Sequence, residues 1–163
     1  MHTRAQELIR TLGLEPHPEG GFFREMFRST DVVAPGDARG SRPAVTTIYF
    51  LLVEGAHSRW HRVLSDEVWH LYEGAPLELM EIDESIGALT RHRLAPVGDG
   101  DGAPVYTIPR RNWQAARSLG SYTLVGCTVG PGFDYADFRM MSDDAETAAK
   151  VRARWPETAA ALI

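Results

Sequence analysis

The sequence is poor in cysteine, and Cys127 is the only one. A single cysteine excludes an intramolecular disulfide, which fits the reducing environment of a cytoplasm. The first thirteen residues also lack the apolar core that a secretory signal peptide requires. We therefore expect a cytoplasmic protein whose fold is stabilised by burial of apolar side chains.

Positive charge is scarce as well. The chain has 17 Lys and Arg against 22 Asp and Glu, which gives a net charge of −5. Binding to nucleic-acid phosphates needs a clustered basic surface, and basic pairs such as Arg110 and Arg111 are too short to form one. We expect no nucleic-acid partner.

Long hydrophobic runs are also missing from the sequence. The longest run, residues 45–53, includes Thr46, Thr47 and Tyr49. It is far shorter than the roughly 20 residues that a membrane-spanning helix needs, and it is rich in strand formers. The run predicts a strand that is covered on both faces, and we expect no membrane partner.

The two ends of the chain favour helices. Thr3 and Gln6 form a capping-box pattern at the start of a helix over residues 3–12, and Gly13 is a typical stop. A second helix is predicted near the C-terminus, with Ser142 as its N-cap.

Between these helices the sequence predicts short strands separated by turns rich in glycine, proline and aspartate. Many short strands favour a β-barrel or a double-sheet sandwich, and 163 residues fit a single domain over residues 1–163. The alternation over 77–82 and 89–94 predicts a hairpin. The expected strands are residues 22–30, 45–53, 77–82, 89–94, 105–109, 113–116 and 121–129.

Residues 55–74 hold the densest group of side chains that can do chemistry. His57, His61, Glu67 and His70 fall within fourteen residues. Three histidines and an acid are the composition of a metal site or of an acid–base site.

The spacing in this stretch resembles the first motif of the cupin superfamily, G-x5-H-x-H-x3-4-E-x6-G. Gly55, His61, Glu67 and Gly74 match the motif, and Val63 stands where the second histidine is expected.

A second cupin motif, which ends on a fourth metal ligand, is expected further along the chain. Only Pro109 matches it. Arg111 stands at the position of a glycine, and Gln114 stands at the position of the ligand histidine.

Longer segments are similar to the cupin-5 (DUF985) family, small jelly-roll proteins sometimes labelled as predicted sugar epimerases. The similarity spans residues 8–140. The segments that carry it are PHPEGGFFRE, IYFLL, SRWHRVLSDEVWHLYEG, PLEL, WQAA and VGCTVGPGFDYADF. The resemblance implies an all-β fold, a cupin-type double-stranded β-helix (jelly-roll barrel) with short N- and C-terminal helices. Small cupins commonly dimerise, so we also expect a homodimer.

The resemblance also implies a divalent metal ion such as Fe, Mn, Zn or Ni, which a complete cupin site holds with three His and one Glu. The ligand positions here carry His61, Glu67 and Gln114, and a neutral amide oxygen is a weak ligand. His57 and His70 could compensate in part, but alternation from Glu67 sends His70 to the other face of the strand. We expect weak metal binding and no certain cofactor.

The alternative role for His61 is acid–base catalysis. In nucleotide-sugar 3,5-epimerases of the same superfamily, a lone His on the equivalent strand removes a proton next to a carbonyl. His61 would be this base, and Glu67 would orient it. A partner acid, often a tyrosine, would return the proton. The available tyrosines are Tyr49, Tyr72, Tyr122 and Tyr135, and the sequence leaves the choice open.

Ligand contacts are expected from polar and aromatic residues of the matching segments, including the rigid loop over residues 15–21 that carries His17. The predicted set is Ser58, Trp69, His70, Trp113, Gln114, Phe133, Glu19 and Arg24. Three functions stay open: an isomerase or epimerase acting on a sugar-like or other small polar carbonyl compound, a metal-dependent cupin enzyme, and a non-catalytic ligand-binding cupin in which His61 and Glu67 only pair with each other.

Overall fold

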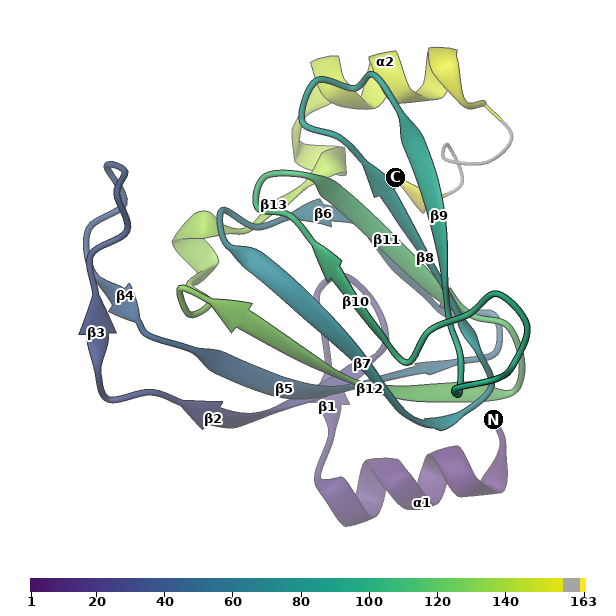
Figure 1. Cartoon of the computed structure of the whole chain (residues 1–163). Helices are drawn as coiled ribbons and strands as arrows, with labels where there is room; N and C mark the ends of the chain where they lie inside the picture. The colour runs from purple at the N-terminus through teal and green to yellow at the C-terminus, as the bar shows by residue number, and fades with distance from the viewer. Residues whose placement is uncertain (157–161) are drawn as a thin grey trace.

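The structure is a computed structural model, and it describes residues 1–156 and 162–163. Two antiparallel sheets face each other and close into a barrel (Figure 1), which is the expected jelly-roll arrangement. The first sheet consists, in spatial order, of β1 (Glu15–Pro16), β2 (Phe22–Arg28), β5 (Thr46–Val53), β12 (Tyr122–Gly130), β7 (Asp66–Gly74) and β10 (Val105–Ile108). The second consists of β13 (Arg139–Met140), β6 (His57–Arg62), β11 (Trp113–Ser118), β8 (Leu77–Ile82) and β9 (Leu89–Leu94).

Each of the predicted strands is present, and the observed ends differ from the predicted ones by at most two residues. The predicted hairpin is confirmed, because β8 pairs with β9 from Leu77–Leu94 to Ile82–Leu89. A further short pair, β3 (Val32–Val33) with β4 (Arg42–Pro43), lies outside the two main sheets.

Strand β5 shows why its apolar run is continuous. Phe50 and Leu52 point between the two sheets and belong to the central core. Leu51 points to the outer side of the sheet, where it packs with Leu8 of helix α1 (Thr3–Leu12). Both faces of the strand are therefore buried, as the sequence predicts.

The helices begin at other caps than the sequence predicts. The ring of His2 accepts a hydrogen bond from the amide of Arg4, so His2 caps α1 and Thr3 is its first residue. Gly13 ends the helix in the left-handed conformation, at φ 63°, as predicted.

Near the C-terminus, helix α2 (Ala145–Arg154) is capped by Asp144, whose carboxylate accepts from the amide of Thr147 at 3.1 Å. Ser142, the predicted cap, lies instead in the short 3-10 helix η2 (Met141–Asp143), because this extra turn shifts the start of α2 along the chain.

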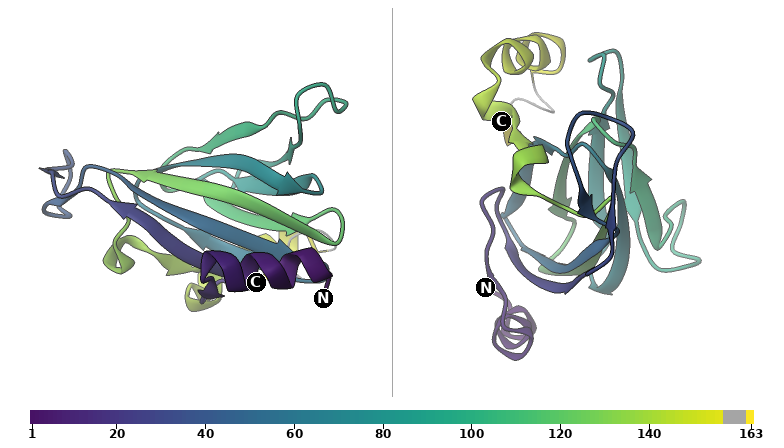
Figure 2. Two further views of the ribbon diagram at one scale, coloured as in Figure 1. Left: turned by 90° about the horizontal axis from the view of Figure 1, so that it is seen from below. Right: turned by 90° about the vertical axis from the view of Figure 1, so that its left-hand side faces the viewer.

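Helices α1 and α2 lie on opposite sides of the barrel (Figures 1 and 2). Under α2 the outer face of the second sheet is covered by a second hydrophobic cluster that includes Trp60, Trp113 and Val151. The space between the sheets is filled at one end by apolar side chains such as Phe50 and Trp69. The cavity described below lies among the polar side chains of the remaining inner face.

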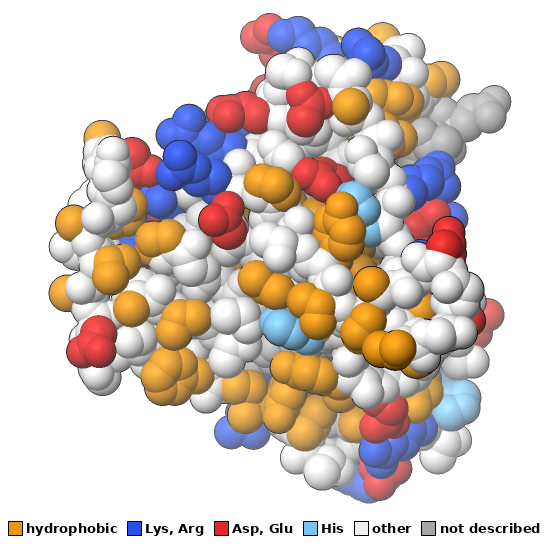
Figure 3. Space-filling model, viewed as in Figure 1, with side chains coloured by type: hydrophobic (Ala, Val, Ile, Leu, Met, Phe, Trp, Pro, Cys, Tyr) orange, Lys and Arg blue, Asp and Glu red, His pale blue; other side chains and the backbone are white. Residues whose placement is uncertain are grey.

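Hydrophobic side chains gather over the outer face of the first sheet that Figure 3 shows. Phe27, Tyr72 and Val105 are exposed on strands of this sheet. The expected homodimer stays a prediction. None of the described helices is long and apolar enough to cross a membrane.

Candidate functional site

A cavity of about 140 Å³ opens between the two sheets. Polar side chains lie on its inner wall, and aromatic rings form much of the rest of its lining. The lining comes from the loop before β2 and from strands β2, β5, β6, β7 and β12, together with the segment around the 3-10 helix η1 (Tyr135–Asp137). The lining residues are His17, Glu19, Phe23, Glu25, Arg28, Thr46, Ile48, His61, Val63, Glu67, Cys127, Val129, Phe133, Tyr135 and Phe138.

His61 is held at both ring nitrogens. Its Nδ1 lies 2.8 Å from the backbone oxygen of Arg59. A carbonyl oxygen can only accept, so Nδ1 carries a hydrogen. Its Nε2 lies 3.1 Å from Oε2 of Glu19. Because Nε2 of this neutral tautomer is an acceptor, His61 and Glu19 must share one proton across that contact.

Glu19 reaches His61 because its loop is fixed against β6. Its backbone oxygen accepts from the amide of Arg59 at 2.9 Å, and its Oε1 accepts from Oγ of Ser58 at 2.9 Å. The neighbouring Gly20 has a φ of 112°, and a Cβ there would overlap the backbone oxygen of His57. Only glycine permits this approach of the loop to the strand.

Burial brings the two partners of the pair closer in proton affinity. Burial raises the pKa of Glu19 from 4.5 to about 6. Burial lowers the pKa of His61 from its ordinary 6.5. A carboxyl group and an imidazole tuned toward each other can exchange a proton at low cost, which suits an acid–base site.

Glu67 lies on the same wall, but its contacts differ from those predicted. Its Oε2 accepts from Nε2 of Gln114, and Oε1 of Gln114 accepts from the indole of Trp69 at 3.0 Å. The thiol of Cys127 also hydrogen-bonds to Glu67. Burial raises the pKa of Glu67. The carboxyl is therefore fixed by neutral donors, and Glu19 makes the contact with Nε2 of His61.

The residues at the expected ligand positions do not fit a metal ion. The oxygen of Gln114 faces the indole of Trp69, and a valine, Val63, replaces the second histidine. Over residues 1–156 and 162–163, no group of three or more His, Cys, Asp or Glu is arranged to hold a metal.

The structure brings several predicted residues together. His61, Glu67, Glu19 and Phe133 line the cavity. Ser58, Trp69 and Gln114 lie behind this wall and hydrogen-bond to the lining carboxylates or to each other.

Other predicted residues lie elsewhere. His70 does not line the cavity, because strand alternation turns it away from Glu67 and Trp69. Trp113 packs in the cluster under α2, with Arg62 over its ring at 4.7 Å. Arg24 donates to the backbone oxygen of Leu12 at the end of α1.

The structure also separates the four tyrosines. Tyr49 and Tyr72 pack edge to face at 5.9 Å, and Tyr122 donates to Glu73 at 2.8 Å. None of these three lines the cavity, whereas Tyr135 does.

Phe138 is a site residue that the sequence reasoning missed. Its ring stacks on the ring of His61, with centroids 5.5 Å apart. The pairing of β13 with β6 and an ion pair at 2.7 Å between Asp137 and Arg42 fix it there. These contacts join distant parts of the chain, so no local pattern signals them.

Comparisons with known proteins identify the family and the fold. The family model described as "Cupin superfamily (DUF985)" matches residues 6–141. The chain belongs to this family. The resemblance predicted from sequence is thus confirmed, and no curated protein matches the chain.

Solved structures show the same fold. A hypothetical protein from Leishmania major is 32% identical, with a TM-score of 0.83, over 97% of this chain and 96% of that chain. A protein from Shewanella oneidensis is 32% identical, with a TM-score of 0.80, over 97% and 94% of the two chains. Oxalate decarboxylase from Bacillus subtilis has 13% identity, a TM-score of 0.58 and coverage of 88% and 34%, and it is similar in fold alone.

Proposed function

We propose that this cupin catalyses proton transfer next to the carbonyl group of a compact polar substrate, as an isomerase or epimerase does. The observation that carries the proposal is the contact of 3.1 Å between Nε2 of His61 and Glu19 on a cavity wall. Both side chains are buried, at 3% and 8% exposure, so solvent does not compete for the shared proton.

In this mechanism His61 and Glu19 act as one acid–base unit. When the proton resides on His61, the Glu19 carboxylate keeps lone pairs that accept a proton from the carbon next to the carbonyl. Glu19 is then a neutral carboxylic acid, and the imidazolium of His61 offsets the negative charge of the enolate that the substrate becomes. Ser58 donates to the other oxygen of Glu19 at 2.9 Å. The same pair returns a proton to the carbon, or a second group returns it from the other side.

Tyr135 is the second group that this proposal favours. It is the one of the four candidate tyrosines that lines the cavity. Its ring lies 6.1 Å from that of Phe138, which stacks on His61. A phenol can donate a proton to a carbanion formed nearby.

The cavity volume supports a small substrate. Pockets for drug-sized ligands measure about 300–1000 Å³, whereas this one measures about 140 Å³. Aromatic walls with a few polar groups at one end suit a compact, sugar-like carbonyl compound.

The experiment is solvent deuterium exchange into the carbon-bound protons of hydroxyacetone, followed by NMR in D₂O. The wild-type protein should exceed the rate without protein, and His61→Ala should lose at least about 100-fold of the enhancement. His92→Ala, which removes a histidine outside the cavity, is the matched control and should retain it.

Persistent exchange in His61→Ala would remove His61 from the mechanism. If hydroxyacetone and related carbonyl compounds bind but no exchange occurs, the protein is a non-catalytic ligand-binding cupin, and the proposal fails.

A further inference from the structure

Acidic side chains outnumber Lys and Arg side chains on the cavity wall. Among the described lining residues, Arg28 is the one Lys or Arg side chain, against the three acids Glu19, Glu25 and Glu67. The charge of Glu19 is matched by two histidines, since its Oε2 lies 3.1 Å from Nε2 of His61 and 3.6 Å from Nδ1 of His17. The two remaining acids must therefore be compared with the single guanidinium.

The guanidinium of Arg28 already has partners. Its Nε and Nη2 donate to the two carboxylate oxygens of Glu25 at 3.0 and 2.6 Å. Its Nη1 donates to the backbone oxygen of Phe133 at 2.9 Å. An anionic ligand would have to displace Glu25 to use this charge.

Neighbouring arginines are engaged in the same way. Arg42 pairs with Asp137 at 2.7 Å, and Arg39 pairs with Asp37 at 2.9 Å. Arg59 donates to the backbone oxygen of Pro18 at 2.7 Å. None of these three guanidinium groups lines the cavity, so they do not provide an anion site there.

Glu67 is in the opposite situation. It is 7% exposed, it lines the cavity, and its hydrogen-bond partners are the neutral groups of Gln114 and Cys127. His61 is the nearby cation when it is protonated, but its Nε2 contacts Glu19, so no cation is hydrogen-bonded to Glu67. A buried carboxylate held only by neutral donors is costly, and a cation placed beside it lowers that cost. The ligand itself can supply the cation.

The aromatic side chains of the same cavity also suit a cation. Phe23, Phe133, Tyr135 and Phe138 line the cavity. Aromatic faces attract ammonium groups, and they offer no compensation to a carboxylate or phosphate.

We infer that the cavity selects compact carbonyl compounds that carry an amino group, accepts neutral ones more weakly, and rejects carboxylates and phosphate esters. The inference rests on the proposed function only in taking a carbonyl compound as the ligand. It separates this site from one that holds a nucleotide-linked sugar, because a diphosphate needs free cationic donors.

The test compares three small methyl ketones at pH 7: 4-amino-2-butanone, 4-hydroxy-2-butanone and levulinate, which carry charges of +1, 0 and −1. Their Kd values are measured by ligand-observed NMR on the whole protein, so no turnover is needed. The amine should bind at least about tenfold more tightly than levulinate, with the neutral ketone between them.

Two substitutions test which carboxylates set the preference among the three ketones. Glu67→Gln should reduce the preference for the amine by about tenfold, because the carboxylate that lacks a hydrogen-bonded cation is gone. Glu25→Gln should free Arg28 and strengthen levulinate binding severalfold. The control Glu146→Gln makes the same charge change in a pair with Lys150 at 2.7 Å on α2, and it should leave the order unchanged.

Equal or tighter binding of levulinate by the wild-type protein overturns the inference, as does failure of all three ketones to bind. If Glu67→Gln does not fold, the inference is still tested by the order of the three Kd values in the wild-type protein and by levulinate binding to Glu25→Gln. A correct binding order without deuterium exchange would refute the proposed function alone. Exchange with the order reversed would refute the ligand class alone.

Discussion

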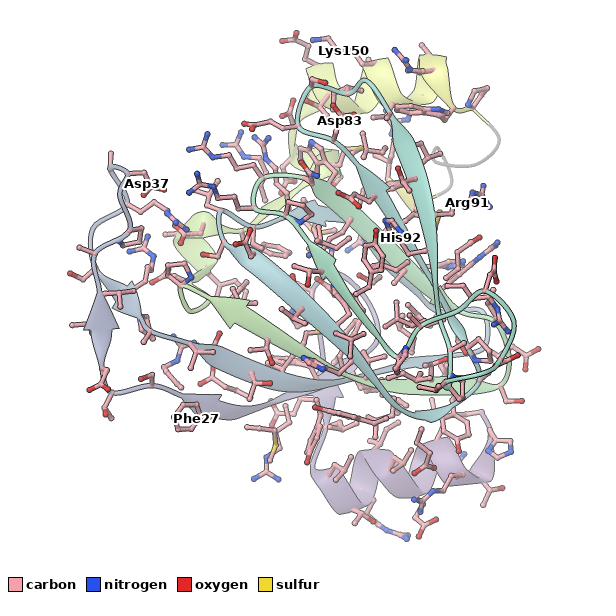
Figure 4. All side chains as sticks on the ribbon, viewed as in Figure 1. Phe27, Asp37, Asp83, Arg91, His92 and Lys150 are labelled. Atoms are coloured by element: carbon pink, nitrogen blue, oxygen red, sulfur yellow. The ribbon has the colours of Figure 1, made fainter. Side chains whose placement is uncertain are left out.

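Among the described residues, two histidines contact a glutamate through Nε2, and the surroundings of these two pairs differ. Nε2 of His61 lies 3.1 Å from Glu19 on the cavity wall. Nε2 of His92 lies 2.8 Å from Glu81, and Figure 4 shows His92 between strands β9 and β10. The chemistry of the two contacts is the same, so any difference in role must come from what surrounds each pair.

The inner pair faces a cavity and a second buried carboxyl, that of Glu67. The ring of the outer histidine is covered by Tyr106, with centroids 3.6 Å apart, and Asn112 donates to Glu81 at 2.6 Å. His92 also lines a hollow of about 350 Å³, but Tyr106 stacks on its ring and its Nε2 contacts Glu81. The two pairs therefore differ in their neighbours: the inner pair borders the buried carboxyl of Glu67, whereas the hollow beside His92 is also lined by Arg91 and Arg93.

The largest expected effect concerns two side-chain amides. Gln114 donates to Glu67 beside the inner pair, and Asn112 donates to Glu81 of the outer pair. Gln114 is fully buried and links Trp69 to Glu67, so Gln114→Leu leaves the indole N–H of Trp69 without a partner and removes the amide donor of Glu67. We expect a loss of about 3–5 kcal/mol in the free energy of unfolding. The matched change Asn112→Leu, at a half-buried amide, should cost about 1 kcal/mol.

Urea denaturation of both variants measures this difference. Equal losses in the two variants would show that the inner amide link does not carry more stability than the outer one.

The next effect concerns the two carboxylates that contact histidine. Glu19→Gln keeps a side chain of the same shape but cannot accept and release the proton, so the deuterium exchange rate should fall about 100-fold, equivalent to about 2.7 kcal/mol. Glu81→Gln makes the same change in the outer pair and should leave the rate unchanged. A fall of similar size in both variants would mean that the loss reflects folding and not proton transfer.

Much of this arrangement follows from local sequence patterns. Alternation places Glu67 and Trp69 on the inner face of β7 and His70 on the outer face, and the periodicity of the other strands predicts the double-sheet barrel. The cupin-like spacing identifies His61 as a residue of the cavity.

The partner of His61 could not be predicted in this way. Glu19 is 42 residues away from His61 in sequence, and its position depends on how closely Gly20 approaches β6. Phe138 reaches His61 through the pairing of β13 with β6. Trp113 was assigned to the ligand because it is aromatic, but its place on β11 turns it to the cluster under α2. Such contacts are set by packing between distant segments.

The smallest expected effect is the pH dependence of stability that the inner pair creates. Burial raises the pKa of Glu19 from 4.5 to about 6, which corresponds to about 2 kcal/mol. Below pH 4.5 the carboxyl is protonated in both the folded and the unfolded chain, so it costs no stability. As the pH rises through 6, the folded chain must ionise a buried carboxyl, and stability falls.

Unfolding free energies of the wild type and Glu19→Gln, measured by urea denaturation at pH 4.5 and pH 7, test this sign. The wild type should lose about 2 kcal/mol relative to Glu19→Gln over that interval. Burial also lowers the pKa values of His17 and His61, which makes stability rise with pH in both proteins. Glu19 partly offsets this lowering at His17, so its removal makes the stability of Glu19→Gln rise further with pH, in the direction of the expected difference. Parallel curves would show that the Glu19 carboxyl titrates alike in the folded and unfolded chain, and the inner pair would then hold its proton no differently from an exposed one.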